Sequence, residues 1–423
     1  MGDTSFRYRD GILHAESVSL VRIAEQCGTP TYVYSLSGIR SGFKRFADAF
    51  KNQQALIAYS VKANSNQAVI AALAGLGAGA DVVSQGELKR ALLAGIPGNR
   101  IVFSGVGKKG EELEAGLRAG VQQFNVESES QLRLLSDVAG RVGTSARVAI
   151  RVNPDVDAGT HDKISTGRRA DKFGVPIGEV SSLYKMAEIL PGLEVVGVDL
   201  HIGSQLTELS PFRVAFYRLA DLLKELRGSG HQITQADLGG GLGVCYEEEN
   251  PPSVVAYAEL IREVFGPFGC QIIIEPGRAV VADSGILLCQ VIEVKGDGDH
   301  RFVVVDAAMN DLLRPALYEA WHSIEPVVEN LESSRRQVVD IVGPVCESGD
   351  VLGRRRNLPH LAPGDLLVIR SVGAYGSVMA SSYNTRPIAA EVLVHETRSS
   401  VIRPRQDLDV LIGHDHIPDW ISS

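Results

Sequence analysis

The feature that most constrains this chain is a repeated alternation of short strand-like runs and helical stretches between about Ala55 and Val281. Eight runs rich in β-branched residues each precede a turn signal and a stretch with apolar residues at i, i+3 and i+4 spacing. The runs read ALIAYSVKA, GADVVS, IVFSG, QQFNVES, RVAIRVN, LEVVGVDLHIG, QADLGGG and IIIEPGRAV. Eight strand–helix units over about 230 residues predict a (β/α)8 barrel of the α/β class. An open doubly wound sheet is the alternative, which is disfavoured because chemically distinctive residues end nearly every run.

The alternation of strand-like runs and helical stretches ends after Asp283. Runs such as RFVVVDAAMN and QVVDIVGPV read as strands joined by turns, with little helix between them. GILHAESVSL and TPTYVYS, near the N-terminus, also read as strands. We therefore predict a barrel domain over residues 36–283. A mostly β domain, a Greek-key-like barrel or sandwich, is predicted over residues 284–423 and is completed by residues 1–35.

The composition of the chain limits the kinds of molecule that it is expected to bind. The net charge of the 423-residue chain is -9, and no long basic run occurs, which argues against nucleic acid. The start lacks an apolar signal segment, and no uncharged apolar run reaches roughly 18 residues, so we expect no membrane span. Five scattered cysteines without CxxC spacing indicate neither a disulfide framework nor a zinc site. We expect a cytoplasmic small-molecule enzyme without a metal.

One lysine has a position suited to catalysis. Lys62 falls at the carboxyl end of the first barrel run, the end at which barrel active sites are built. A partly desolvated amine at that place can form an imine with an aldehyde. The alternative for any single lysine is a solvated side chain at a strand end.

Two later loops have phosphate-binding character. Gly239, Gly240 and Gly241 follow the seventh run, where backbone N–H groups can surround phosphate oxygens. His201 and Ser204 follow the sixth run, and could shape the loop around a cofactor. Turns use the same glycines, and a single histidine is more often structural than functional.

The eighth run ends in an acidic and basic tetrapeptide, Glu275, Pro276, Gly277 and Arg278. A carboxylate beside a pyridine nitrogen favours the protonated ring, while a guanidinium can bind a carboxylate in a fork. A surface ion pair at a turn is the alternative.

Together these segments resemble the fold-type III decarboxylases that depend on pyridoxal 5'-phosphate (PLP). GPVCESGDVL, MNDLLRPALYEAWH and GAYGSVMASSYNTRP in the second domain are similar to the diaminopimelate decarboxylase family. RVNPDVDAGTH and ISTGRRADKFGV in the barrel are similar to it as well. The resemblance implies decarboxylation of meso-2,6-diaminopimelate to L-lysine and CO2, the last step of lysine biosynthesis.

The resemblance also implies a role for each site residue. The catalytic residues would be Lys62 as the imine-forming amine, His201 stacked on the ring, Glu275 at the ring nitrogen and Cys346 as the proton donor. The cofactor-binding residues would be Lys62, His201, Ser204, Gly239, Gly240, Gly241, Glu275, Pro276, Gly277, Arg278 and Tyr375. The substrate-binding residues would be Arg278, Arg314, Tyr318, Glu347 and Tyr375. In this family the Cys-Glu pair reaches the neighbouring subunit, so a homodimer with shared active sites is expected.

Three other functions compete with this one. A related carboxylate-bearing amino acid, or a glutamyl group on a carrier protein, would need the same chemistry. A racemase of the same fold is disfavoured because Glu275 stands where such racemases place an arginine. A catalytically inactive regulator would be expected to have lost Lys62 or Cys346, and the chain retains both.

Overall fold

The computed structural model describes residues 5–157, 166–167, 171–297, 300–329 and 336–421. It divides into two compact units, Ile39–Val281 and Met1–Gly38 with Ala282–Ser423. Parts of the two barrel motifs that resemble the decarboxylase family, at 158–165 and 168–170, lie outside the described residues.

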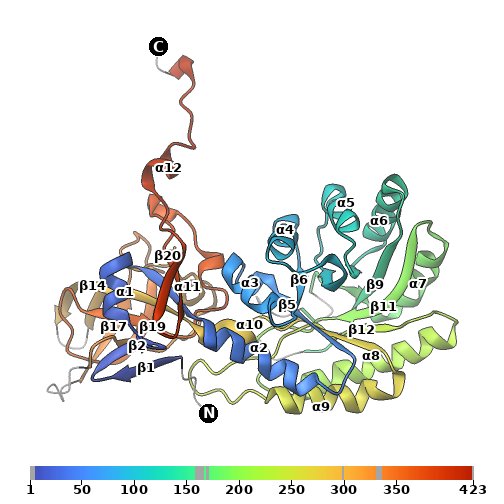
Figure 1. The fold of residues 1–423 in the computed structure, drawn as a ribbon, viewed down its shortest axis with the longest axis horizontal. Coiled ribbons are helices and arrows are strands. Elements are labelled where there is room, and N and C mark those ends of the chain that lie inside the picture. Colours follow the sequence, from blue (N-terminus) through green and yellow to red (C-terminus); the bar gives the residue numbers. More distant parts are fainter. Residues whose placement is uncertain (1–4, 158–165, 168–170, 298–299, 330–335, 422–423) are drawn as a thin grey trace. The chain divides into compact units, whose positions relative to one another are not determined.

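Unit Ile39–Val281 is a closed parallel barrel, as predicted (Figure 1). Its strands are β5 (Ala55–Ser60), β6 (Gly79–Val82), β7 (Ile101–Phe103), β8 (Gln123–Val126), β9 (Ala146–Asn153), β11 (Leu193–Leu200), β12 (Gln235–Asp237) and β13 (Gln271–Ile274). β13 pairs in parallel with β5 and closes the ring, and β10 (Val175–Pro176) adds to the edge of β9. Each strand coincides with one of the eight predicted runs, although β9 and β13 begin one residue before theirs.

Helices alternate with the strands, and some of them begin at a capping side chain. They are α2 (Leu36–Phe50), α3 (Gln67–Ala74), α4 (Gln85–Leu93), α5 (Gly110–Ala119), α6 (Glu129–Val142), α7 (Val180–Ile189), α8 (Ser210–Gly228), α9 (Val254–Phe265) and α10 (Arg278–Val281). The side chain of Ser128 accepts the N–H of Gln131 at the start of α6, and Gly143 ends that helix with φ 74°. Helix–sheet packing is close: a Cβ at Gly116 of α5 would lie 2.8 Å from the ring of Phe124.

The other unit is built on a nine-stranded mixed sheet. Its strands are β4 (Thr31–Ser35), β14 (Gly285–Asp297), β15 (His300–Val305), β16 (Ile324–Pro326), β17 (Arg336–Val342), β18 (Val351–Pro359), β19 (Leu366–Ile369), β20 (Ala390–His395) and β21 (Arg398–Arg403). β4 lies between β14 and β20, so the N-terminal segment completes this unit as predicted. A separate three-stranded sheet contains β1 (Phe6–Arg9), β2 (Ile12–Ala15) and β3 (Val18–Ser19), followed by α1 (Leu20–Cys27).

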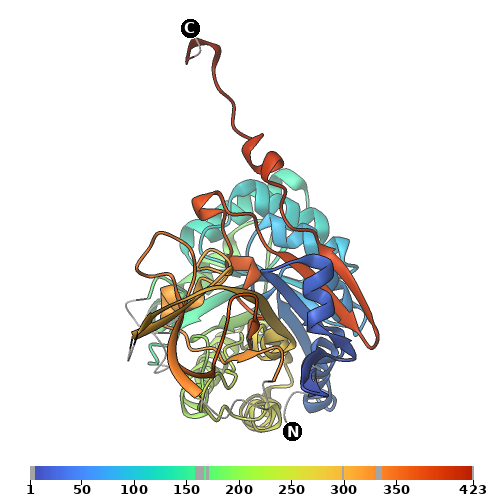
Figure 2. The same cartoon turned by 90° about the vertical axis from the view of Figure 1, so that its left-hand side faces the viewer.

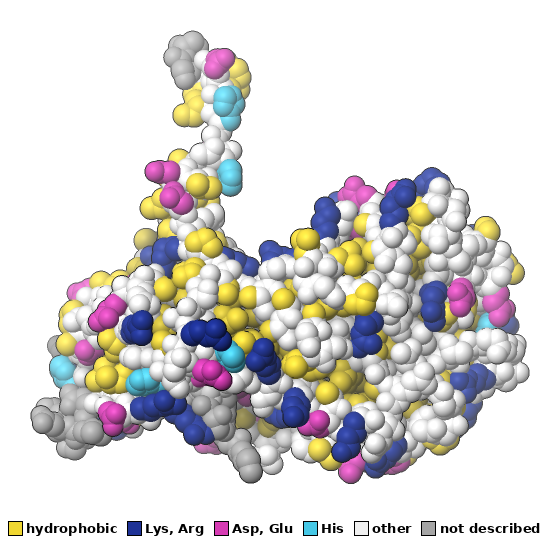
Figure 3. Space-filling view, in the orientation of Figure 1, with side chains coloured by type: hydrophobic (Ala, Val, Ile, Leu, Met, Phe, Trp, Pro, Cys, Tyr) yellow, Lys and Arg dark blue, Asp and Glu magenta, His cyan; other side chains and the backbone are white. Residues whose placement is uncertain are grey.

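The C-terminal segment leaves the body of its own unit, as Figures 1 and 2 both show. From Asp407 to Ile421 it contains α12 (Leu408–Ile412) and no buried residue. Apolar side chains are exposed along it (Figure 3), with Ile417 69% and Trp420 77% accessible. None of the helices in the described ranges is long and apolar enough to cross a bilayer.

Candidate active site

The amine of Lys62 lies at the carboxyl end of the first barrel strand. The chain leaves β5 at Ser60 and makes one short helical turn, η1 (Val61–Ala63), which carries Lys62. Its Nζ donates to Oδ2 of Asp81 at 2.8 Å, and Oγ of Ser60 donates to the same oxygen at 2.8 Å. Asp81 is fully buried, whereas the Lys62 side chain is 35% exposed. The amine is therefore held in place while it remains open to a ligand.

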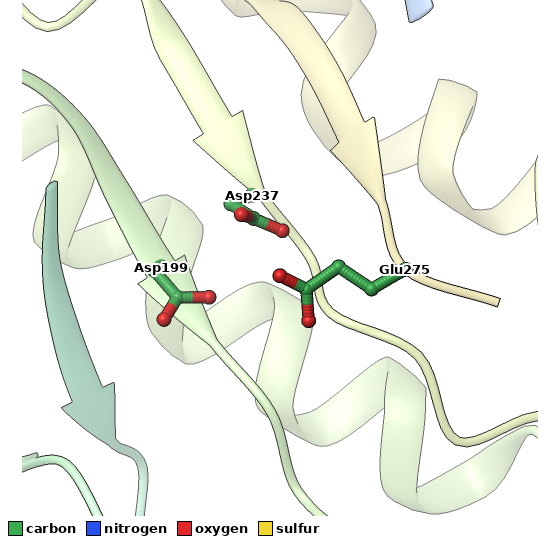
Figure 4. Close-up of side chains that lie close together, drawn as sticks. All are labelled: Asp199, Asp237 and Glu275. Carbon is green, nitrogen blue, oxygen red and sulfur yellow. The ribbon is translucent and has the colours of Figure 1, made fainter. Parts of the chain in front are cut away.

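Three buried carboxyl groups converge at the ends of neighbouring strands. Asp199 ends the β11 region, Asp237 ends β12, and Glu275 follows β13, and their side chains point toward one another (Figure 4). Oxygen atoms from all three lie within 4.8 Å of one another. Burial, with repulsion from Asp81, raises the pKa of Asp237 to about 7. Burial, with repulsion from Asp237, raises the pKa values of Asp199 and Glu275 well above their usual range.

Buried cations lie close to this acidic group. Arg151 pairs with Glu127 at 3.2 Å, and its guanidinium lies 5.1 Å from the ring centre of Phe173. Lys108 donates to the backbone carbonyls of Gly105 and Asn125, at 2.7 and 2.6 Å. Burial lowers the pKa of Lys108 to about 8.

His201 is joined to the glycine loop. The backbone N–H of Gly240 donates to His201 Nδ1 at 3.1 Å, so in the neutral ring the proton is on Nε2. Burial, with Arg151 and Lys62 nearby, holds the pKa of His201 well below its usual range. The ring is therefore neutral at physiological pH.

The glycine loop needs its glycines for close backbone approach. A Cβ at Gly240 would lie 2.2 Å from the carbonyl oxygen of Glu275. Gly241 has φ +114°, and a Cβ there would lie 2.5 Å from the carbonyl oxygen of Gly203. The N–H of Glu275 donates to the carbonyl of Gly239 at 2.8 Å, which ties the loop to the acidic tetrapeptide.

Arg278 is buried and oriented by two hydroxyl groups. Its Nη1 donates to Oη of Tyr246 at 2.7 Å and its Nη2 to Oγ of Ser204 at 2.9 Å. In the same segment, the carbonyl of Pro276 accepts the N–H of Ser60 at 3.2 Å, and Gly277 packs against Ala63. The structure thus brings the predicted residues of the barrel to one end of it.

The remaining predicted site residues belong to the other unit. Cys346 and Glu347 are exposed in the loop 343–350. Tyr383 donates through its hydroxyl to Glu347, and the backbone N–H of Cys346 donates to Oδ1 of Asn384 at 3.4 Å. Buried Asp350 ends the loop. Two of the family-like motifs therefore meet at this loop.

Arg314 begins α11 (Arg314–Tyr318) and is buried. Its Nε donates to Nε2 of His322 at 3.3 Å, while Nδ1 of His322 contacts the carbonyl of Arg370 at 2.9 Å and must donate to it. The Arg314 guanidinium lies 5.9 Å from the ring centre of Tyr318. Tyr375 has φ +57°, an uncommon backbone conformation for a residue other than glycine.

Comparison with known proteins decides the family. Residues 36–282 match the family model described as pyridoxal-dependent decarboxylase, pyridoxal binding domain. The chain is 46% identical to diaminopimelate decarboxylase of Zymomonas mobilis, over 98% of this chain and 99% of the relative. It is 50% identical to diaminopimelate decarboxylase of Pseudomonas aeruginosa, with the same coverage. The chain belongs to the diaminopimelate decarboxylase family.

Solved structures of this family share the fold. Diaminopimelate decarboxylase from Helicobacter pylori, complexed with L-lysine, has a TM-score of 0.90 at 43% identity, covering 93% of this chain and 98% of that one. Diaminopimelate decarboxylase from M. jannaschii, in co-complex with L-lysine, has a TM-score of 0.93 at 39% identity, covering 98% of both chains.

The residues of the barrel fit the PLP cofactor of the diaminopimelate decarboxylase family. Lys62 offers a positioned and accessible amine, and Glu275 offers a buried carboxyl group for the ring nitrogen. The loop at Gly239–Gly241 exposes backbone where a side chain would not fit. PLP is therefore the cofactor of this chain.

Sequence reasoning did not assign five residues that hold the site together: Asp81, Asp199, Asp237, Tyr246 and Asp350. A signal for three of them was present, because these aspartates stand at or near the ends of predicted barrel runs, where side chains of parallel strands meet. Tyr246 and Asp350 lie in or at the end of loops, and no pattern in the sequence predicts that Tyr246 contacts Arg278 or that Asp350 accepts from the backbone of Met309 and Val345.

Proposed function

We propose that this chain is a carbon–carbon lyase that decarboxylates meso-2,6-diaminopimelate to L-lysine and CO2 with PLP. Relatives named diaminopimelate decarboxylase, 46% and 50% identical over nearly the full length, support the substrate. The observation that carries the chemistry is the Lys62 amine, paired with buried Asp81 at the barrel end that also holds Glu275.

Each of the predicted site residues of the barrel would have its own role in binding the cofactor. When bound, PLP supplies an electron sink for the bond that breaks as the carboxylate leaves. Lys62 would bind the cofactor through its amine, and Glu275 would hold a proton at the ring nitrogen. His201, neutral and linked to the glycine loop, would cover the ring without adding a charge. Backbone N–H groups at Gly239–Gly241 would bind the phosphate, with Ser204 beside them.

The far end of the substrate would determine specificity. Arg278, Arg314 and Tyr318 would bind the distal carboxylate, Glu347 the distal ammonium, and Tyr375 both cofactor and substrate. A substrate without that carboxylate would leave guanidinium groups unpaired, and sites of this kind can reject such analogues by about 10⁴–10⁵-fold. Cys346 would deliver the proton that replaces the lost carboxylate.

We also infer a homodimer in which Cys346 and Glu347 of one copy complete the barrel site of the other. The exposure of both residues in loop 343–350 supports this inference. A cytoplasmic location is inferred as well, since all five cysteines lie in the described part of the chain and none forms a disulfide there.

Product analysis tests the function directly. The purified chain with PLP is expected to release CO2 and L-lysine in equal amounts from meso-diaminopimelate, and to turn over L-ornithine at least about 10³-fold more slowly. Lys62→Ala should abolish turnover and the visible absorbance of bound PLP. Lys89→Ala, an exposed lysine on α4, is the matched control and should retain both.

Failure has two distinct forms. Bound PLP without CO2 from any carboxylate-bearing amino acid would point to a decarboxylase-like regulator. Faster release of CO2 from a related carboxylate-bearing compound than from meso-diaminopimelate would keep the chemistry and replace the substrate.

A further inference from the structure

The three carboxyl groups of the barrel differ in the hydrogen bonds that they accept. Asp237 accepts on both oxygens: Oδ1 from the N–H of Gly239 at 3.1 Å, and Oδ2 from Nδ2 of Asn125 at 3.0 Å. The amide of Gln123 adds a longer contact to Oδ2 at 3.4 Å. Three N–H donors directed at one carboxyl group favour its ionised form.

Asp199 has the opposite environment. It is 2% exposed, and no hydrogen-bond donor contacts its Oδ1 anywhere in the described chain. Ionising a buried carboxyl group whose Oδ1 has no donor is costly, and the protonated form avoids this cost. Glu275 is intermediate: Oγ of Ser104 donates to its Oε1 at 3.3 Å, and its side chain hydrogen bonds to Asp237.

The surrounding charges do not neutralise the three carboxyl groups Asp199, Asp237 and Glu275, which we call the triad. Lys62 is paired with Asp81, Arg151 with Glu127, and Lys108 with two backbone carbonyls. Among the described residues no ion pair reaches Asp199, Asp237 or Glu275. The titratable and charged groups that act on Glu275 from the surrounding strands are Lys62, Asp81, Arg151, Asp199, Asp237 and Tyr257. Three negative charges so close together in a buried site cannot coexist, so the triad holds protons.

We propose that Asp237 is the carboxyl group of this triad that ionises, that Asp199 and Glu275 each keep a proton, and that Asp237 thereby acts as a positioning residue for the proton at Glu275. The inference rests on the proposed function, because it concerns the carboxyl group that would face the ring nitrogen of PLP. In the cofactor-free chain the protonated carboxyl group of Glu275 donates a hydrogen bond to the Asp237 carboxylate. The negative charge of Asp237 then keeps a proton at this end of the barrel.

The causes that act on the three acidities agree with this assignment. Burial raises the pKa of all three carboxyl groups, but at Asp237 the hydrogen bonds from Asn125 and Gly239 act in the opposite direction. These donors favour ionisation at Asp237.

Infrared difference spectroscopy of the full chain tests the assignment without turnover. The C=O stretch of protonated carboxyl groups is recorded across pH on the chain prepared without PLP. At neutral pH, Glu275→Gln should remove one band and Asp199→Asn another. Asp237→Asn should leave both bands at acid pH, and should lower the pH at which the Glu275 band disappears by about one unit or more.

Asp199→Asn is the matched control, because it replaces one neutral group with another and should leave the Glu275 titration unchanged. The proposal is overturned if Asp237→Asn leaves that titration unchanged, or if Asp199→Asn keeps both bands at neutral pH. Should Asp237→Asn not fold, the Asp199→Asn spectrum decides alone. A wild-type chain that releases no CO2 would defeat the proposed function while leaving these bands interpretable.

Discussion

At the scale of single residues, exposure separates the proposed proton donor from the other cysteines of its unit. Cys346 is exposed, whereas Cys289 is buried and burial raises the pKa of its thiol. A donor that must reach a ligand needs this accessibility, and a thiol buried among apolar groups does not have it.

Cys346→Ala is expected to lower kcat by about 10²–10⁴-fold, the usual contribution of a general acid, with little change in KM. PLP should still bind, because Cys346 is not among the residues proposed to bind the cofactor. Steady-state kinetics and the visible spectrum check both points. Ser348→Ala, in the same exposed loop, is the control. Equal losses in both variants would indicate that the loop matters and the thiol does not.

Asp311 makes stability depend on pH. Burial raises its pKa to about 6, from 3.8 in the unfolded chain. Between these values the folded chain keeps a proton that the unfolded chain has released, so stability falls as pH rises through this window. Above pH 6 Asp311 is ionised in both the folded and the unfolded chain, so the whole of this loss of stability is present.

Asp311→Asn should remove about 3 kcal/mol of this pH dependence, because one pKa unit corresponds to about 1.4 kcal/mol. The amide oxygen can still accept the N–H of Ala308, which contacts Oδ2 at 3.0 Å in the wild type. Urea unfolding at acid and neutral pH, followed by circular dichroism, measures the difference. An unchanged difference between the two pH values would show that Asp311 does not titrate in this window.

At the scale of elements, Asp350 connects the proton-donor loop to the segment before α11. Its Oδ2 accepts the N–H of Val345 and its Oδ1 that of Met309, both at 2.7 Å. Loop 343–350 and helix α11 therefore depend on one buried carboxylate.

Asp350→Ala should lower kcat and raise KM together, about 10-fold or more each, because donor and substrate residues lose their common support. The unfolding free energy should fall by about 1–3 kcal/mol, since two buried N–H groups lose their acceptor. Asp350→Asn should lose less, as its oxygen still accepts one of them. Asp365→Ala, which removes an exposed turn acceptor, is the control. Normal kinetics in Asp350→Ala would argue against this coupling.

Most barrel strands could be predicted from the sequence because they are compact β-branched runs before a turn, whereas β12 (QAD) is marked only by the glycine loop that follows it. Strand β18 could not be predicted from the sequence. Its residues, VLGRRRNLP, include three consecutive arginines and a glycine and do not alternate between apolar and polar side chains. Lys62 and Glu275 were predictable from their places at strand ends. Asp81 and Asp237 also stand at or near strand ends, but their contacts with Lys62 and Glu275 could not be predicted, because these contacts form only when distant strands close the ring.

At the scale of the whole molecule, a shared active site predicts complementation. Lys62→Ala and Cys346→Ala chains should each be inactive, yet a mixture unfolded and refolded together should recover about a quarter of wild-type activity. Half of the dimers would then be mixed, each with one intact site. Activity assays and sedimentation measure this. Recovery near zero, in a mixture shown to be dimeric, would place both residues in sites formed by one chain.

The C-terminal segment has a consequence for spectroscopy. The chain has two tryptophans: Trp420, on this exposed segment, and Trp321, whose ring lies 4.1 Å from the guanidinium of Arg356. Neither belongs to the barrel unit, so indole emission does not report directly on the barrel. With Trp420→Phe, the remaining emission would come from one indole three residues beyond α11, which would report on the segment that carries Arg314 and Tyr318.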